Sequence, residues 1–175
     1  MSISTKRVLR DLVEQRKGLI VPGAFNAMSA RVIADLGFEA VYLTGAGLTN
    51  MHLGLPDHGY IGVKDVVEHT FAIRDAVEVP LIVDMDTGFG NALNVRHTIR
   101  SLERAGADAV QIEDQAMPKK CGHFAGKQTV TTAEMVGKIR AAVDARHDQN
   151  FQIIARTDAR TVEGFDSAIE RAVRY

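Results

Sequence analysis

The chain has 175 residues, a formal net charge of −1 at pH 7 and 46% hydrophobic residues. This balance is typical of one globular domain, and it lacks the basic excess expected of a nucleic-acid-binding protein. Apolar runs are too short to span a membrane, and residues 1–7 lack the apolar segment of a signal peptide. The single cysteine, Cys121, excludes an internal disulfide and fits a reducing compartment. We therefore expect a cytoplasmic protein that binds neither nucleic acid nor a membrane.

Apolar residues follow helical and strand spacing in turn along the chain. The spacing predicts helices over 5–17, 27–36, 63–77, 93–105, 133–146 and 167–175, and strands over 19–21, 40–44, 81–86, 109–113 and 151–156. Strands that alternate with helices form right-handed βαβ units around a parallel sheet. The sequence therefore predicts an α/β fold.

Polar side chains gather where the predicted strands end. Residues two apart on a strand share one face of the sheet. The polar pairs are Tyr42 with Thr44, Asp84 with Asp86, Gln111 with Glu113, and Arg156 with Asp158. The carboxyl ends of parallel strands meet at one end of a sheet or barrel, where α/β enzymes hold their active sites. We therefore expect an active site at that end.

Asp84 and Asp86 come just before Gly88 and Gly90, which end the third strand. Two carboxylates on one face repel each other unless a cation, a proton or strong hydrogen-bond donors compensate. Carboxylate oxygens suit a hard divalent ion, Mg²⁺ or Mn²⁺. The alternative is that both aspartates cap the following turn and helix.

Gly45-Ala46-Gly47 follows the second strand and looks like the start of a dinucleotide-binding loop. Asn50 stands where that motif needs its third glycine, and we expect no helix to begin there. A lone Gly-x-Gly is weak evidence for a dinucleotide. We expect these glycines instead to let a small anionic substrate approach backbone N–H groups.

Cys121 lies in a long loop after the fourth strand, in the run Lys119-Lys120-Cys121-Gly122-His123. Cations beside a thiol lower its pKa and favour the thiolate. Glycines at positions 122 and 126 would let this loop move as a lid. The alternative is an exposed basic loop with an incidental cysteine.

Several of these segments occur together in one known superfamily. Asp84-Met-Asp-Thr-Gly-Phe-Gly-Asn91, Glu113-Asp-Gln115 and Lys119-Lys-Cys-Gly-His123 resemble motifs of the isocitrate lyase/phosphoenolpyruvate mutase superfamily. Pro22-Gly-Ala24, Tyr42-Leu-Thr-Gly45, Leu53-Gly-Leu-Pro-Asp57 and Ala155-Arg-Thr-Asp158 fit in the same order. Within the superfamily, the chain looks most like the methylisocitrate lyase and 2,3-dimethylmalate lyase branch. The resemblance covers nearly the whole chain.

The resemblance implies a (β/α)8 TIM-type barrel of the phosphoenolpyruvate mutase type, and a homotetramer. Such a barrel has eight strands and about 250 residues, whereas the spacing here predicts five strands. We therefore expect residues 1–175 to form a single barrel domain of about five βα units, truncated on its C-terminal side.

The resemblance also assigns roles to individual residues. Asp84 and Asp86 would hold Mg²⁺, or Mn²⁺ in its place, with Glu113 in or near the coordination shell of the ion. The substrate-binding residues would be Tyr42, Thr44, Gly45, Ala46, Cys121, Gly122, His123 and Arg156, and the catalytic ones Cys121, His123, Tyr42 and Asp57. Relatives often carry Ser and Gly where Thr44 and Ala46 stand here, which leaves the fit around the substrate open.

These roles imply a carbon–carbon lyase. It would cleave a 2-hydroxy di- or tricarboxylate, such as methylisocitrate or dimethylmalate, into pyruvate or glyoxylate and a second carboxylate. The alternatives in the superfamily are carboxyphosphonoenolpyruvate or phosphoenolpyruvate mutases, and oxaloacetate decarboxylases or hydrolases. Outside enzymology, the alternatives are a barrel fragment that binds 2-oxo acids without turnover, and an interaction module.

Overall fold

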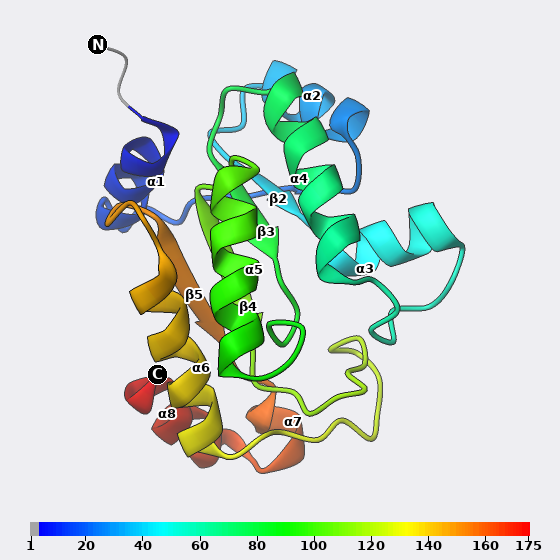
Figure 1. Cartoon of the computed structure of the whole chain (residues 1–175), viewed down its shortest axis with the longest axis vertical. Helices are drawn as coiled ribbons and strands as arrows, with labels where there is room; N and C mark the ends of the chain where they lie inside the picture. The colour runs from blue at the N-terminus through cyan, green and yellow to red at the C-terminus, as the bar shows by residue number, and fades with distance from the viewer. Residues whose placement is uncertain (1–3) are drawn as a thin grey trace.

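The computed structural model describes residues 4–175 and contains one parallel sheet with the strand order β1-β2-β3-β4-β5 (Figure 1). The strands are β1 (Gly23–Ala24), β2 (Val41–Leu43), β3 (Leu81–Asp84), β4 (Ala109–Glu113) and β5 (Gln152–Arg156). Each strand pairs with the next one in the chain, as in Val41 with Leu81 and Ile82 with Ala109. The predicted α/β fold with a parallel sheet is therefore confirmed.

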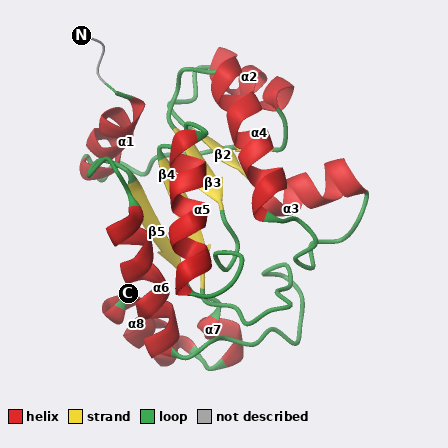
Figure 2. Ribbon diagram, viewed as in Figure 1, coloured by secondary structure: helices red, strands yellow, loops and turns green. Residues whose placement is uncertain are grey.

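Helices connect successive strands and cover one face of the sheet (Figure 2). The long ones are α1 (Thr5–Glu14), α2 (Ala27–Asp35), α4 (Val63–Ala76), α5 (Ala92–Arg104), α6 (Thr132–Ala145) and α8 (Phe165–Arg174). Short ones are α3 (Gly45–Leu48), the π-helix η1 (Thr49–Leu53) and α7 (Ala159–Val162). Neighbouring helices α2, α4, α5 and α6 pack against one another in that order. None of the helices in residues 4–175 is long and apolar enough to cross a membrane.

The sheet has two apolar faces of different size. Val41, Leu43, Val83 and Ile112 belong to the large buried cluster beneath the helices. The residues between them face the concave side, where Leu9, Ala40, Ile82 and Ala109 form a second, smaller cluster. Leu9 comes from α1, so this helix closes the concave side at the amino ends of the strands. The carboxyl ends stay free for polar side chains.

A buried carboxylate ties α1 to the sheet at the closed end. Asp108 accepts hydrogen bonds from Thr5 Oγ1 at 2.5 Å and from the Leu81 backbone N–H at 2.8 Å. Arg74 of α4 donates to the same carboxylate at 3.0 Å. Burial raises the pKa of Asp108, while the hydrogen bonds from Thr5 and Leu81 and the charge of Arg74 oppose that rise. One side chain thus joins two helices and a strand.

Three expected local features are wrong. The first strand is not at 19–21 but at Gly23–Ala24, because the backbone of β2 pairs further along: the Tyr42 N–H donates to Pro22 O and the Thr44 N–H to Ala24 O. A helix does begin at Gly45, because the Thr44 side chain accepts from the Gly47 N–H and caps α3. This helix has four residues and leads into η1.

The third is the expected strand conformation of Asp86. Strand β3 ends at Asp84, and Asp86 has a φ of +48°, so strand alternation does not extend to it. The Asp86 N–H donates to Asp84 Oδ1 at 3.0 Å, which is a turn closed by a side chain. The two carboxylates are brought together by this turn.

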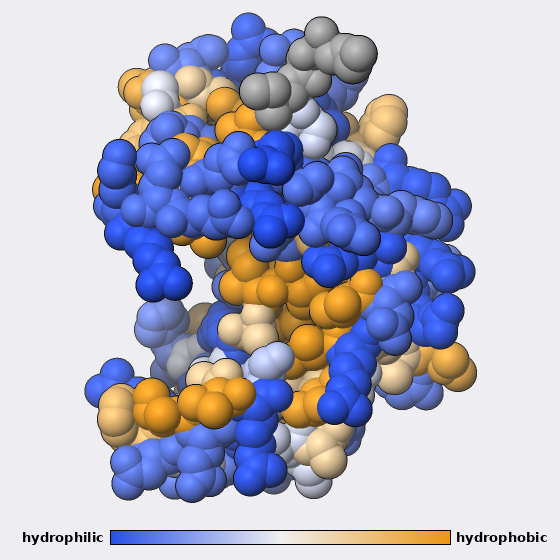
Figure 3. Space-filling view, turned by 90° about the vertical axis from the view of Figure 1, so that its left-hand side faces the viewer, coloured by the Kyte–Doolittle hydropathy of each residue, from blue (hydrophilic) through white to orange (hydrophobic). Residues whose placement is uncertain are grey.

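The β5 side of the sheet is the more exposed one. Strand β3 is buried along most of its length, whereas every residue of β5 is partly or largely exposed. Figure 3, turned so that the left side of Figure 1 faces the viewer, shows a band of hydrophobic residues between two polar regions. Among the described residues, no strand pairs with the outer edge of β5. The sheet is therefore an open arc rather than a closed barrel.

Replacing Asp108 by alanine should destabilise the fold by about 3–5 kcal/mol, the usual cost of breaking a buried ion pair. The change leaves Arg74 and the Leu81 N–H without their carboxylate partner. Urea unfolding followed by circular dichroism measures the free energy of unfolding. Asp11→Ala is the control, because the Arg7–Asp11 ion pair is about half exposed and should contribute little. Equal losses in both variants would contradict the role of Asp108.

Candidate active site

A cavity of about 180 Å³ lies at the carboxyl ends of the strands. Its walls come from the ends of β2, β3, β4 and β5 and from the loop after β4. The lining residues are Tyr42, Thr44, Ala46, Asp57, Asp84, Glu113, Lys119, Lys120, Cys121, Gly122, His123 and Arg156. Ten of these twelve, all except the two lysines, are residues that the sequence assigns to the site.

Gly45 and Asp86 are the two remaining predicted site residues, and both adjoin the cavity. The Gly45 N–H donates to Asp84 Oδ2 at 3.3 Å. A Cβ at position 45 would lie 3.2 Å from Asp84 Oδ2 and 3.4 Å from Asp86 Oδ1. Both carboxylates therefore point at the backbone of Gly45, and a side chain there would crowd them.

Lys119 is the counter-ion of the acidic group. Its ammonium lies 2.6 Å from Asp57 Oδ1 and 2.7 Å from Asp86 Oδ1, and all three side chains are buried. Burial and repulsion from Asp84 raise the pKa of Asp86 to about 6, against the attraction of Lys119. Burial lowers the pKa of Lys119, but attraction by Asp86 and Asp57 outweighs it and raises this pKa above its usual value. The lysine therefore stays charged between two aspartates.

Glu113 contributes a carboxylate oxygen that protein atoms leave free. Its side chain is 4% exposed, Oε2 lies 3.2 Å from Arg156 Nη1, and Oε1 has no hydrogen-bond partner within residues 4–175. Burial raises the pKa of Glu113 to about 8, with Arg156 opposing the rise and Asp84 adding to it. Buried polar atoms without a partner are rare and costly, so this oxygen indicates a place for a proton or a cation.

The acidic residues suit an ion that keeps its water. No group of three His, Cys, Asp or Glu side chains among residues 4–175 is close enough to hold a metal ion as a preformed cage. Mg²⁺ does not need such a cage, because it binds through one or two carboxylates and retains several waters. The oxygen-only donor set, the free Oε1 of Glu113 and the space at Gly45 all fit this ion.

Tyr42 is held as a hydrogen-bond donor. Gln111 Nε2 donates to the Tyr42 hydroxyl oxygen at 3.0 Å, so the hydroxyl proton is available to another acceptor. Burial, followed by the negative charge of Asp84, raises the pKa of Tyr42 well above its usual value of about 10. The hydroxyl stays protonated, and an anionic ligand would compete with Asp84 for its proton.

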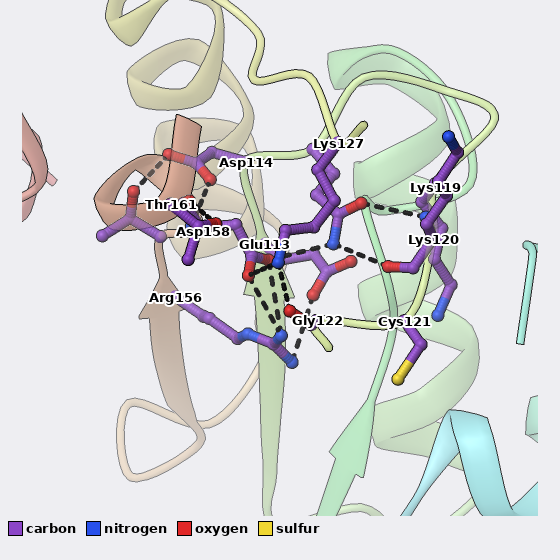
Figure 4. A network of polar contacts seen from close by, with 12 residues as sticks. Glu113, Asp114, Lys119, Lys120, Cys121, Gly122, Lys127, Arg156, Asp158 and Thr161 are labelled. Atoms are coloured by element: carbon purple, nitrogen blue, oxygen red, sulfur yellow. Dashed lines mark hydrogen bonds and ion pairs between the residues drawn. The ribbon is translucent and has the colours of Figure 1, made fainter. Parts of the chain in front are cut away.

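Arg156 places a cation opposite the acidic wall. Its guanidinium contacts Glu113 at 3.2 Å and Asp158 at 3.3 Å (Figure 4). Burial lowers its pKa, and the charges of Glu113 and Asp158 more than offset this, so the pKa is raised. The side chain is 36% exposed, which leaves part of the guanidinium open to the cavity. A planar fork of this kind binds carboxylates in a bidentate manner.

The lid consists of residues 119–126 and carries Cys121 over the cavity. Cys121 Sγ lies 3.5 Å from His123 Nδ1. The two lysines are not beside the thiol as the sequence suggested: the Lys119 ammonium pairs with Asp57 and Asp86, and that of Lys120 donates to Ala125 O and Gly126 O. Sequence proximity misled here, because consecutive loop residues point in different directions.

The lid touches the loop that carries Asp57. The Cys121 N–H donates to Asp57 O at 3.0 Å. The rings of His58 and Phe124 stack with their centroids 5.4 Å apart. These contacts hold the lid across the cavity in the described conformation, and Gly126, with a φ of +76°, supplies a backbone position suited to a hinge.

The sequence indicates that Gln111 and Gln115 lie near the site but not what they do there. Gln111 orients Tyr42, and Gln115 is buried and hydrogen-bonded to the backbone of Lys120. For Lys119 the sequence indicates only its proximity to the thiol. A buried lysine next to two acidic motifs could have been suspected as a counter-ion, but only the structure shows which acids it meets.

The family model described as "Phosphoenolpyruvate phosphomutase" matches residues 9–175. The 2,3-dimethylmalate lyase of Eubacterium barkeri is 51% identical over 99% of this chain and 60% of its own length. The 2-methylisocitrate lyase of Aeropyrum pernix is 53% identical over 96% of this chain and 54% of its own length. The chain thus spans little more than half the length of these relatives.

Solved structures similar to this chain come from the same superfamily as these relatives. A 2,3-dimethylmalate lyase structure matches 99% of this chain and 59% of its own length with a TM-score of 0.93 and 36% identity. The structure of oxaloacetate acetylhydrolase with 3,3-difluorooxalacetate matches 98% of this chain and 59% of its own length, with a TM-score of 0.91 and 39% identity. The structure of phosphonopyruvate hydrolase with oxalate and Mg²⁺ matches 99% of this chain and 59% of its own length, with a TM-score of 0.91 and 32% identity. The five-stranded arc is therefore part of a TIM-type barrel of the phosphoenolpyruvate mutase type. The chain belongs to the phosphoenolpyruvate mutase/isocitrate lyase family.

Proposed function

We propose that this chain carries the active site of a Mg²⁺-dependent carbon–carbon lyase acting on a 2-hydroxy di- or tricarboxylate. The observation that carries the proposal is the cavity itself, which places the Cys121 thiol, the Arg156 guanidinium and the acidic residues around one space of about 180 Å³. The identity of 51–53% to dimethylmalate and methylisocitrate lyases supports the same class of reaction.

Asp84 and Asp86 would hold the Mg²⁺ ion, with Glu113 in or near its shell. Its charge, when bound, favours the deprotonated form of a neighbouring substrate hydroxyl. Lys119 affects the charge of this acidic group, because its ammonium lies within ion-pair distance of both Asp57 and Asp86. The solved phosphonopyruvate hydrolase with oxalate and Mg²⁺ is a precedent for this ion in the same fold.

The chain's own residues bind and orient the substrate. Tyr42, Thr44, Gly45 and Ala46 surround the 2-oxo acid portion, with the Tyr42 hydroxyl as a donor. Arg156 binds a carboxylate through its exposed edge. Loss of the C–C bond leaves negative charge on the departing carboxylate fragment, and fixed donors stabilise such charge best in a site that excludes water.

Cys121 delivers a proton to the carbon of the departing fragment. The thiol lies on the lid above the cavity, and His123 Nδ1 at 3.5 Å can return a proton to the sulfur after turnover. The closed lid keeps solvent from reaching the carbanion before Cys121 does. His123 therefore acts through the thiol.

The second candidate is hydrolysis of oxaloacetate, favoured by the likeness to oxaloacetate acetylhydrolase at a TM-score of 0.91. A substrate panel separates the candidates. It comprises methylisocitrate, isocitrate, dimethylmalate, oxaloacetate and phosphoenolpyruvate, each with Mg²⁺ and with EDTA. We expect release of pyruvate or glyoxylate from a 2-hydroxy acid with Mg²⁺ only. Activity confined to oxaloacetate or phosphoenolpyruvate would overturn the lyase proposal.

In EDTA, the free energy of unfolding should fall as the pH rises from about 5 to about 8. The folded protein keeps a proton on Glu113 up to its pKa of about 8, whereas the unfolded chain loses it near 4.5. The unfolded state thus binds fewer protons in this window, so rising pH favours unfolding. Urea titrations across the window are the measurement. Glu113→Gln should show a smaller fall, and an equal fall in both proteins would sink the assignment.

Asp86→Asn should remove the stabilisation that Mg²⁺ gives to the folded protein. Lys119 keeps its contact with Asp57 in this variant, so the fold should persist. Thermal melts with EDTA and with Mg²⁺ are compared for the wild type, Asp86→Asn and the exposed control Asp35→Asn. A Mg²⁺-dependent shift in the melting temperature that survives unchanged in Asp86→Asn would show that the ion binds elsewhere.

Cys121→Ser should lower turnover of the best cleavage substrate by the roughly 10²–10⁴-fold typical of lost general acid catalysis. The hydroxyl is a much weaker acid than the thiol, yet it has nearly the same shape. Steady-state rates at saturating Mg²⁺ are measured together with product binding, which should remain. Near-normal turnover would remove Cys121 from the mechanism.

A further inference from the structure

A buried lysine fastens the lid to the barrel, and the roles assigned above do not use it. The Lys127 side chain is 3% exposed. Its ammonium donates to the carbonyl oxygen of Gly122 and lies 3.5 Å from Asp158 Oδ1 (Figure 4). Lys127 therefore connects the lid with the segment that follows β5.

Asp158 needs a second cation. Its side chain is 9% exposed and lies 3.3 Å from Arg156, which also contacts the buried Glu113. Charges buried in this way interact strongly because water screens them poorly. An Asp158 carboxylate paired with Arg156 alone would compete with a ligand for the guanidinium. Lys127 supplies Asp158 with a second positive charge, which weakens this competition.

The lid passes directly over the guanidinium. A Cβ at Gly122 would lie 2.5 Å from Nη2 of Arg156, so a larger residue here would displace the end of the Arg156 side chain. The backbone of Lys120, the residue before Cys121, is held by two hydrogen bonds. Gln115 accepts from the Lys120 N–H and donates to Lys120 O, both at 2.9 Å. Gln115 also donates to Asp158 Oδ2 at 2.9 Å. These contacts fix the lid relative to Arg156.

We propose that Lys127 is a positioning residue for the reaction. It neutralises Asp158 and holds the Gly122 carbonyl, so that the lid closes over Arg156 while the guanidinium remains free to bind a substrate carboxylate. The effect on carboxylate binding rests on the proposed function, whereas the effect on the lid is a property of the protein alone.

Three variants of the full chain test the proposal. Lys127→Met removes the ammonium and keeps an unbranched side chain of similar length, whereas Lys127→Arg keeps the charge. Lys64→Met is the control, because it removes one lysine from the exposed surface of α4. Amide hydrogen exchange reports the opening of residues 119–126 without ligand. Calorimetric titration with oxalate in the presence of Mg²⁺ reports carboxylate binding.

In Lys127→Met, lid amides should exchange about tenfold faster and oxalate should bind about tenfold more weakly, the scale of one lost charge-assisted hydrogen bond. Lys127→Arg should recover most of both losses, and Lys64→Met should match the wild type. Unchanged lid exchange in Lys127→Met would overturn the proposal. Equal acceleration throughout β4 and β5 would also overturn it, because it would show a general structural role.

The two proposals fail in different ways. If the wild type neither binds oxalate nor cleaves any substrate, the proposed function fails, and the exchange data still decide whether Lys127 holds the lid. If the lid of Lys127→Met opens while oxalate affinity is unchanged, the link from Lys127 to Arg156 is wrong.

Discussion

The structure depends on the compensation of like charges at the carboxyl ends of a parallel sheet. Asp57, Asp84, Asp86 and Glu113 are gathered within one small cavity and its wall, where the surroundings exclude much of the water. The buried ammonium of Lys119 lies between Asp57 and Asp86 and offsets part of their negative charge. Burial raises the pKa of Glu113, and the charge of Arg156 offsets this rise only in part. The site is therefore prepared for added positive charge.

The two ends of the sheet use buried charge for different purposes. At the amino ends, Asp108 has partners from α1, α4 and β3, and its charge holds elements together. At the carboxyl ends, Glu113 Oε1 has no protein partner in residues 4–175, and part of Arg156 stays open to the cavity. A satisfied carboxylate stabilises the fold, whereas an incompletely satisfied one indicates chemistry.

The lid is part of the same electrostatic system. Lys119 in the lid and Lys127 just after it are both buried beside carboxylates, and they flank the segment that carries Cys121. Opening the lid would separate these cations from Asp86 and Asp158. The charge state of the cavity and the position of the thiol are therefore linked, and a bound anion or cation would change both.

The sequence by itself determined the order of strands and helices, because the alternation of apolar segments allows few other folds. It also predicted that Tyr42, Asp84, Glu113 and Arg156 converge, because the carboxyl ends of parallel strands meet at one edge of a sheet. Asp57 and Ala46, in contrast, were assigned to the site only by the resemblance to a known superfamily. It misplaced the first strand, since residues 19–21 form an apolar run typical of a strand, whereas the residues that pair, Gly23–Ala24, carry no such pattern. A strand's pairing partner is a tertiary property.

Only the tertiary structure decided how the polar groups are paired. Asp84 and Asp86 meet through a turn in which Asp86 has a φ of +48°, and not through strand alternation. Lys119 turns toward Asp57 and Asp86, and Lys127 reaches Asp158 across 31 positions of the chain. Loop side chains have no fixed period, so their directions depend on the buried carboxylates that attract them. Sequence spacing specifies which groups are present, and packing specifies which charges each of them meets.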